Sequence, residues 1–125
     1  MRTRILLADD HTLMRQGLRE ILSHESAFEV VAEASTGLEA LEMAEQTQPD
    51  VAVIDIAMRE LNGIETTAQI VKRVPGVAVL ILSMYNDERY VVRAVKAGAR
   101  GYVLKDSAAD ELVHAIRAVQ EGRPF

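Results

Sequence analysis

Polar side chains that could do chemistry stand directly after short apolar segments of this chain. Asp9 and Asp10 follow the first such segment, and Asp55 follows the third. Ser83 and Lys105 follow the fourth and fifth. A set of three carboxylates, one hydroxyl and one amine is suited to phosphoryl transfer if the fold brings its members together.

The three carboxylates favour a divalent cation. Neighbouring carboxylates repel one another, and a cation placed among them relieves that repulsion. The chain has no cysteine, so we expect oxygen ligands. Magnesium fits best, because it binds one or two carboxylates and leaves a position for a phosphoryl oxygen. Lys105 would then attract a second phosphoryl oxygen, Ser83 would donate to a third, and Asp55 would be the nucleophile.

Five apolar segments alternate with five amphipathic ones, and together they predict how these side chains are positioned. The apolar segments are typical of buried strands and cover residues 5–8, 30–34, 51–54, 77–82 and 102–104. Apolar residues recur at helical spacing within residues 14–22, 38–44, 64–71, 91–95 and 112–119. Five successive strand–helix units predict a doubly wound α/β fold with a five-stranded parallel sheet in the order 2-1-3-4-5. In that order the first and third strands are neighbours, so their carboxylates would meet at one edge of the sheet.

Several helix starts carry capping signals. Thr36 with Glu39 has the spacing of a capping box, and Asn62 with Glu65 has the asparagine equivalent. Ser107 is expected to cap the last helix. These positions agree with the division into strands and helices.

Length and composition indicate one globular domain. The chain has 125 residues, of which 49% are hydrophobic and 26% charged. Its net charge of −5 opposes contact with nucleic acid over the whole surface. The apolar run near the amino terminus is too short for a signal peptide or a membrane span, so we expect a cytoplasmic protein without membrane contact.

The ordered set of motifs resembles the receiver domains of two-component response regulators over essentially the whole chain. The resemblance rests on four segments, Leu7–His11, Val53–Met58, Leu82–Met84 and Gly101–Asp106. Four segments, Ala8–Thr12, Leu82–Tyr85, Ala97–Tyr102 and Leu104–Asp106, are similar to the NarL/FixJ (LuxR-type) subclass. The resemblance implies a flavodoxin-like, CheY-like (βα)5 fold.

This resemblance implies roles for the acidic residues. Asp55 would accept a phosphoryl group from a sensor histidine kinase. Asp10, Asp55 and the backbone carbonyl of Ala57 would hold magnesium, and Asp9 would act through water. The domain would signal rather than act as an enzyme, apart from catalysing its own phosphorylation and dephosphorylation.

The resemblance also implies a switch and a larger context. Ser83 and Lys105 would bind the phosphoryl group, and Tyr102 would change orientation with it. Residues 1–125 would form the receiver domain, and a helix-turn-helix output domain would follow and make all contact with DNA. A phosphorylation-dependent homodimer is a further expectation. Residues 89–125 carry seven basic and four acidic residues, so we expect the output surface in this part of the chain.

Some residues depart from the common pattern of the family. Arg59 and Asp106 stand where many receivers have proline. Met84 is bulky where a small residue is common, so we expect narrower access to the phosphoryl group. We interpret His11 as a polar residue at a helix start rather than as a ligand or a phosphohistidine.

Three other functions fit the residues less well. A haloacid-dehalogenase-like phosphatase would carry an Asp-x-Asp pattern after the first strand, whereas Asp9 and Asp10 are adjacent. A flavin-binding flavodoxin-like protein would need a phosphate loop rich in Ser and Thr at that place. A degenerate receiver that only binds proteins should have lost Asp10, Asp55 or Lys105, and all three are present.

Overall fold

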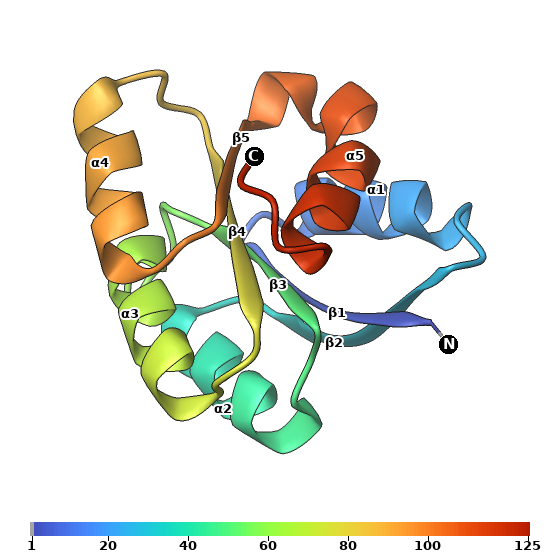
Figure 1. Cartoon of the computed structure of the whole chain (residues 1–125), viewed down its shortest axis with the longest axis horizontal. Helices are drawn as coiled ribbons and strands as arrows, with labels where there is room; N and C mark the ends of the chain where they lie inside the picture. Colours follow the sequence, from blue (N-terminus) through green and yellow to red (C-terminus); the bar gives the residue numbers. More distant parts are fainter. Residues whose placement is uncertain (1) are drawn as a thin grey trace.

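The computed structural model describes residues 2–125 and shows three layers, with a central sheet between two layers of helices (Figure 1). The five strands are parallel and lie in the order β2-β1-β3-β4-β5, as predicted. Their bounds are β1 Thr3–Ala8, β2 Phe28–Ala34, β3 Val51–Asp55, β4 Ala78–Ser83 and β5 Gly101–Leu104.

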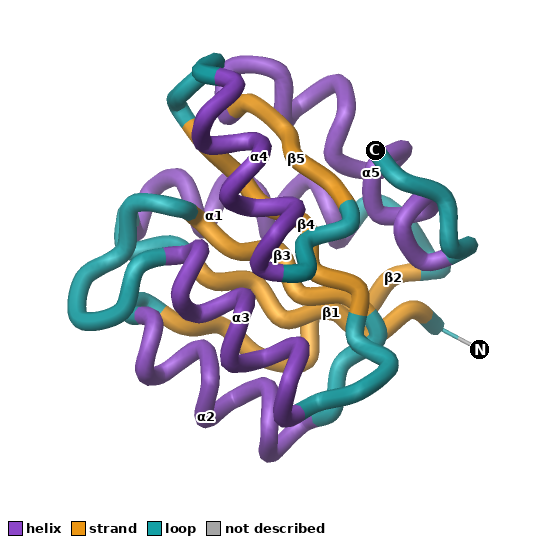
Figure 2. The backbone as a smooth tube through the Cα atoms, turned by 60° about the vertical axis from the view of Figure 1, so that its left-hand side comes forward, coloured by secondary structure: helices purple, strands orange, loops and turns teal. Residues whose placement is uncertain are grey.

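Helices cover both faces of the sheet. Helices α2, α3 and α4 lie side by side on one face (Figure 2), and α1 and α5 pack on the other. Their bounds are α1 Thr12–Ser23, α2 Gly37–Thr47, α3 Gly63–Arg73, α4 Glu88–Ala97 and α5 Ala108–Gln120, with a 3-10 turn, η1, at Lys105–Ser107. Within residues 2–125, none of these helices has the length and apolar character that crossing a membrane requires.

The strands contribute to two separate apolar cores, because successive side chains of a strand point to opposite faces. In β4, Val79 and Ile81 pack toward α2, α3 and α4, whereas Leu80 and Leu82 pack toward α1 and α5. All four of these side chains have no exposed surface. Burial on both faces explains why the inner strands β1, β3 and β4 appear in the sequence as apolar runs, whereas the edge strand β2 is interrupted by Glu33.

Two of the three predicted caps are confirmed. The side chains of Thr36 and Asn62 accept hydrogen bonds from the backbone N–H groups three residues later, at the starts of α2 and α3. The prediction for Ser107 is wrong, since its side chain makes no capping bond. Turn η1 runs directly into α5, and the backbone N–H of Ala108 already donates to the carbonyl of Lys105.

Candidate functional site

The register of the sheet brings the predicted acidic residues to one edge. Ala8 of β1 pairs with Ile54 of β3, so Asp9 and Asp55 follow at the same level. Asp9 has no exposed surface and Asp55 is 1% exposed. Two carboxylates buried in adjacent positions are costly unless a partner compensates their charge.

Lys105 supplies part of that compensation. Its Nζ lies 3.2 Å from Oδ2 of Asp9 and 3.2 Å from Oδ2 of Asp55, and only 6% of its side chain is exposed. Apart from Lys105, neither Oδ2 atom has a partner. Lys105 therefore acts on both carboxylates mainly as a nearby positive charge, and both oxygen atoms retain acceptor capacity.

The surroundings of Asp55 oppose its ionisation. Burial raises the pKa of Asp55, and the neighbouring charge of Asp9 raises it further. Lys105 and the backbone N–H of Ala57, which donates to Asp55 Oδ1 at 3.3 Å, act on this pKa in the opposite direction. Ionisation of Asp55 therefore lowers the free energy of unfolding.

The donor set at this edge suits a divalent cation. Asp9, Asp10, His11 and Asp55 each offer one ligand atom, and these four atoms lie within 4.8 Å of one another. Asp10 Oδ1 is buried without a hydrogen-bond partner, as are the two Oδ2 atoms that face Lys105. Such buried oxygen atoms are suited to a hard cation. Ala57 reaches the cluster through its N–H, and its carbonyl as a ligand stays a prediction.

Ser83 and Tyr102 lie at the same edge of the sheet and are connected through Tyr85, a contact that sequence reasoning missed. The backbone N–H of Tyr85 donates to Ser83 Oγ at 2.9 Å, and its carbonyl accepts from the Tyr102 hydroxyl at 2.9 Å. Burial raises the pKa of Tyr102, so its hydroxyl remains a donor at neutral pH. In the sequence, Tyr85 stands out only as the last residue of the segment Leu82–Tyr85, and its side chain does not indicate the contact that its backbone makes.

Arg15 and Gly63 also shape the site and were not predicted to do so. Arg15 donates to the backbone carbonyl of Asp9 at 2.6 Å and to Glu33 Oε1 at 3.1 Å, and so ties the loop after β1 to β2. Gly63 lies against the end of β3, where an added Cβ would come within 2.4 Å of the Asp55 carbonyl oxygen. A charged residue within an amphipathic helix and a glycine directly after a cap are weak signals in a sequence.

The interpretation of His11 as merely a polar residue at a helix start is incomplete. His11 occupies the position before α1 without a side-chain capping bond. Its Nδ1 lies 3.2 Å from Asp10 Oδ1 and 3.3 Å from Asp9 Oδ1. An open pocket of about 300 Å³ lies beside this cluster, and Lys105 and Met84 are among its lining residues. That the bulky Met84 side chain narrows access to the phosphoryl group stays a prediction.

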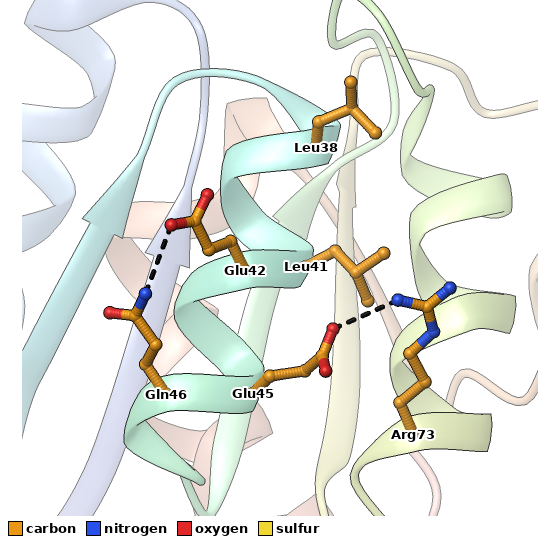
Figure 3. Close-up of a pocket in the computed structure, with 6 residues that line it drawn as sticks. All are labelled: Leu38, Leu41, Glu42, Glu45, Gln46 and Arg73. Atoms are coloured by element: carbon orange, nitrogen blue, oxygen red, sulfur yellow. Dashed lines mark hydrogen bonds and ion pairs between the residues drawn. The ribbon is translucent and has the colours of Figure 1, made fainter.

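Another hollow lies away from these groups, between α2 and α3 (Figure 3). Leu38 and Leu41 line it together with Glu45 and Arg73, whose side chains form an ion pair at 3.1 Å. It contains none of the residues that the sequence predicts to do chemistry. The acidic edge is therefore the candidate site.

The fold and the acidic edge together define a class of signalling domain. Residues 5–117 match the family model of the response regulator receiver domain, so the chain belongs to that family. Its role is therefore that of a signal receiver rather than of a metabolic enzyme.

Curated relatives of the chain include response regulators, some of them described as transcriptional regulatory proteins. The chain is 44% identical over 121 residues to the transcriptional regulatory protein DegU of Brevibacillus brevis, covering 97% of this chain and 51% of DegU. It is 36% identical to the response regulator VraR of Staphylococcus aureus, covering 98% of this chain and 58% of VraR. The chain thus spans about half the length of the curated relatives that it matches.

Solved structures agree with this assignment. The signal receiver domain of a NarL response regulator from Mycobacterium tuberculosis matches with a TM-score of 0.93 and 34% identity, and 98% of each chain is covered. A LuxR-family response regulator from Aurantimonas sp. SI85-9A1 matches with a TM-score of 0.94 and 37% identity, covering 99% of this chain and 89% of that one. The predicted fold class and subclass are confirmed.

Proposed function

We propose that Asp55 accepts a phosphoryl group from a sensor histidine kinase. The observation that carries this proposal is the buried Asp55 carboxylate, whose Oδ2 lies 3.2 Å from the Lys105 ammonium and has no other partner. Asp55 stands at the end of a strand buried along its length, so its reactive atoms are held in place.

The chemistry is the transfer of a phosphoryl group from nitrogen to oxygen. A carboxylate oxygen of Asp55 forms a bond to phosphorus while the bond between phosphorus and the donor's imidazole nitrogen breaks, and that nitrogen takes up a proton. Lys105 and the Ser83 hydroxyl stabilise the charge on the phosphoryl oxygens. Hydrolysis catalysed by the domain itself would later remove the phosphoryl group.

Magnesium is the expected cofactor. Asp10, Asp55 and the Ala57 carbonyl would hold it, and Asp9 would contact it through water. When bound, it offsets negative charge on the carboxylates and on the phosphoryl oxygens. The buried oxygen atoms of Asp10 and Asp55 that lack partners support this assignment.

Intact-protein mass spectrometry tests the transfer. The chain is incubated with acetyl phosphate, with magnesium or with a chelator in its place. We expect the mass of one phosphoryl group to be added only with magnesium, and not to Asp55→Asn. The matched control Asp110→Asn, which changes an exposed aspartate, should be modified like the wild type. An unmodified wild type in the presence of magnesium would contradict the proposal.

We further propose that the signal leaves the site through Ser83, Tyr85 and Tyr102. A phosphoryl group that accepts from the Ser83 hydroxyl would draw that hydroxyl toward Asp55 and away from Tyr85, whose N–H donates to it. The carbonyl of Tyr85 accepts from the Tyr102 hydroxyl, so a shift of Tyr85 would reach Tyr102. The Tyr85 ring stacks on Tyr90 of α4 with centroids 4.8 Å apart, which extends the connection to that helix. Such an element with two arrangements can act as a switch.

Backbone NMR with the phosphoryl mimic beryllofluoride tests this route. We expect shifts at Tyr85, at Tyr102 and along α4. Shifts confined to the residues around Asp55 would contradict it.

A helix-turn-helix output domain would bind DNA after residue 125, and phosphorylation would promote a homodimer. The support is that relatives described as transcriptional regulatory proteins are about twice as long as the segment they share with this chain. Mobility-shift assays should show no DNA binding by residues 1–125 alone, because the chain carries a net charge of −5.

A further inference from the structure

His11 adds a nitrogen donor to a site otherwise made of oxygen atoms. Its Nδ1 lies 3.2 Å from Asp10 Oδ1 and 3.3 Å from Asp9 Oδ1. The His11 side chain is 61% exposed, so the ring can rotate without disturbing either core. Two carboxylates of the cluster, Asp9 and Asp55, are almost fully buried and each has an oxygen atom without a hydrogen-bond partner.

The spacing of these atoms matches what one ion requires. An octahedral ion with metal–ligand bonds of about 2.1 Å holds adjacent ligand atoms about 3.0 Å apart. His11 Nδ1 and Asp10 Oδ1 are already separated by nearly this distance, at 3.2 Å. A small rotation of the exposed ring would allow both atoms to contact the same ion.

We propose that His11 Nδ1 is a metal ligand and that the pocket is therefore a mixed nitrogen–oxygen site, which takes Co²⁺ and related transition dications through His11. The inference rests on the proposed function, because Asp10 and Asp55 are the carboxylates assigned to magnesium. Imidazole is a good ligand for cobalt, nickel and zinc, whereas magnesium prefers oxygen. His11 thus strengthens binding of transition metals and contributes little to binding of magnesium.

A simpler role for His11 predicts the opposite result. If the ring only pairs with the carboxylates of Asp9 and Asp10, it competes with any cation for the same oxygen atoms. Removing the ring would then leave the binding of every cation unchanged or tighter. The two roles are separated by the sign of the change in cobalt affinity.

Isothermal titration of the untagged chain with Co²⁺ and, separately, Mg²⁺ tests the inference. His11→Ala should weaken Co²⁺ binding at least about tenfold and change Mg²⁺ binding less than about twofold. His24→Ala is the matched control, because His24 is also exposed and also faces a carboxylate, with Nε2 3.3 Å from Glu20 Oε1. It should leave both affinities unchanged.

Pulsed EPR of bound Mn²⁺ gives a second readout. Wild-type protein and His24→Ala should show coupling to an imidazole nitrogen, and His11→Ala should lose it. An unchanged ratio of Co²⁺ to Mg²⁺ affinity in His11→Ala, or absence of the nitrogen coupling in the wild type, would overturn the inference. Failure of the wild type to bind Mg²⁺ would instead count against the proposed magnesium site, so the two failures are distinguishable.

Discussion

Strand β3 is buried along its whole length, but its two parts differ in what burial contributes. Val51–Ile54 are apolar and have no exposed surface, so they stabilise the fold through both cores. Asp55 is buried to nearly the same extent, and there burial raises the pKa of its carboxyl group. Ile54 and Asp55 are adjacent, yet burial of Ile54 stabilises the protein, whereas burial of Asp55, which supplies the reactive group, lowers stability.

The largest loss of stability is expected from truncating an apolar side chain of β3. Ile54→Ala should lower the free energy of unfolding by about 2–5 kcal/mol, because it removes buried methyl groups and leaves a cavity. Urea denaturation measures this loss. Leu13→Ala serves as the control, since Leu13 is 83% exposed, and it should change stability by about 0.5 kcal/mol or less. Equal losses at the two positions would break the comparison.

Gly63→Ala tests how closely the chain packs around the reactive end of β3. The added Cβ would meet the Asp55 carbonyl oxygen at 2.4 Å, so α3 or β3 must shift. We expect a loss of about 1–3 kcal/mol in urea denaturation and weaker magnesium binding. Gly17→Ala lies within α1 where a Cβ meets nothing, and it should stabilise the protein by roughly 0.5–1 kcal/mol. Stabilisation by both changes would show that Gly63 is not constrained.

Asp55→Asn should stabilise the protein without metal by about 1 kcal/mol at neutral pH, because it removes a buried charge beside Asp9. The raised pKa means that the folded state holds the proton more tightly than the unfolded state does. The loss of stability caused by ionised Asp55 is therefore greatest above the pKa of the folded state. It disappears as the pH falls from that pKa toward 3.8, the ordinary pKa of an aspartate.

Thermal unfolding of the wild type and Asp55→Asn across this pH range measures the difference. The two curves should converge at acid pH. Asp110→Asn, at an exposed position, should give no such gain. A constant or growing advantage of Asp55→Asn toward low pH would contradict the account.

A smaller effect on stability should distinguish the starts of α3 and α5. Asn62→Ala should cost roughly 0.5–1 kcal/mol, because it removes the acceptor of the Glu65 N–H at the start of α3. Ser107→Ala should cost less, since the Ser107 side chain makes no capping bond. Chemical denaturation of both variants in parallel compares them, and a greater loss for Ser107→Ala would show that the capping assignment is wrong.

The sheet order and the acidic edge could be predicted because they follow from patterns within the chain. Apolar runs ending in Asp9, Asp55, Ser83 and Lys105 are enough to place four side chains once a parallel sheet is assumed. The role of Tyr85 could not be predicted in this way, because its backbone connects Ser83 to Tyr102 and its residue type does not report that.

Other contacts depend on side-chain direction or on an irregular turn. Arg15 reaches back from α1 to the carbonyl of Asp9, and His11 directs Nδ1 toward the acids although most of its side chain is exposed. Ser107 has the residue type of a cap, but the 3-10 turn before α5 already supplies the acceptor for the N–H of Ala108. Patterns along a sequence do not record such local geometry.

Mapping the phosphorylated residue tests the central claim most directly. Borohydride reduces an acyl phosphate to an alcohol, so a phosphorylated aspartate becomes homoserine, which peptide mass spectrometry can locate. After reaction with acetyl phosphate and magnesium, we expect this conversion at Asp55 alone. Conversion at Asp9 or Asp10, or an unconverted Asp55 in a chain that carries the phosphoryl mass, would contradict the account.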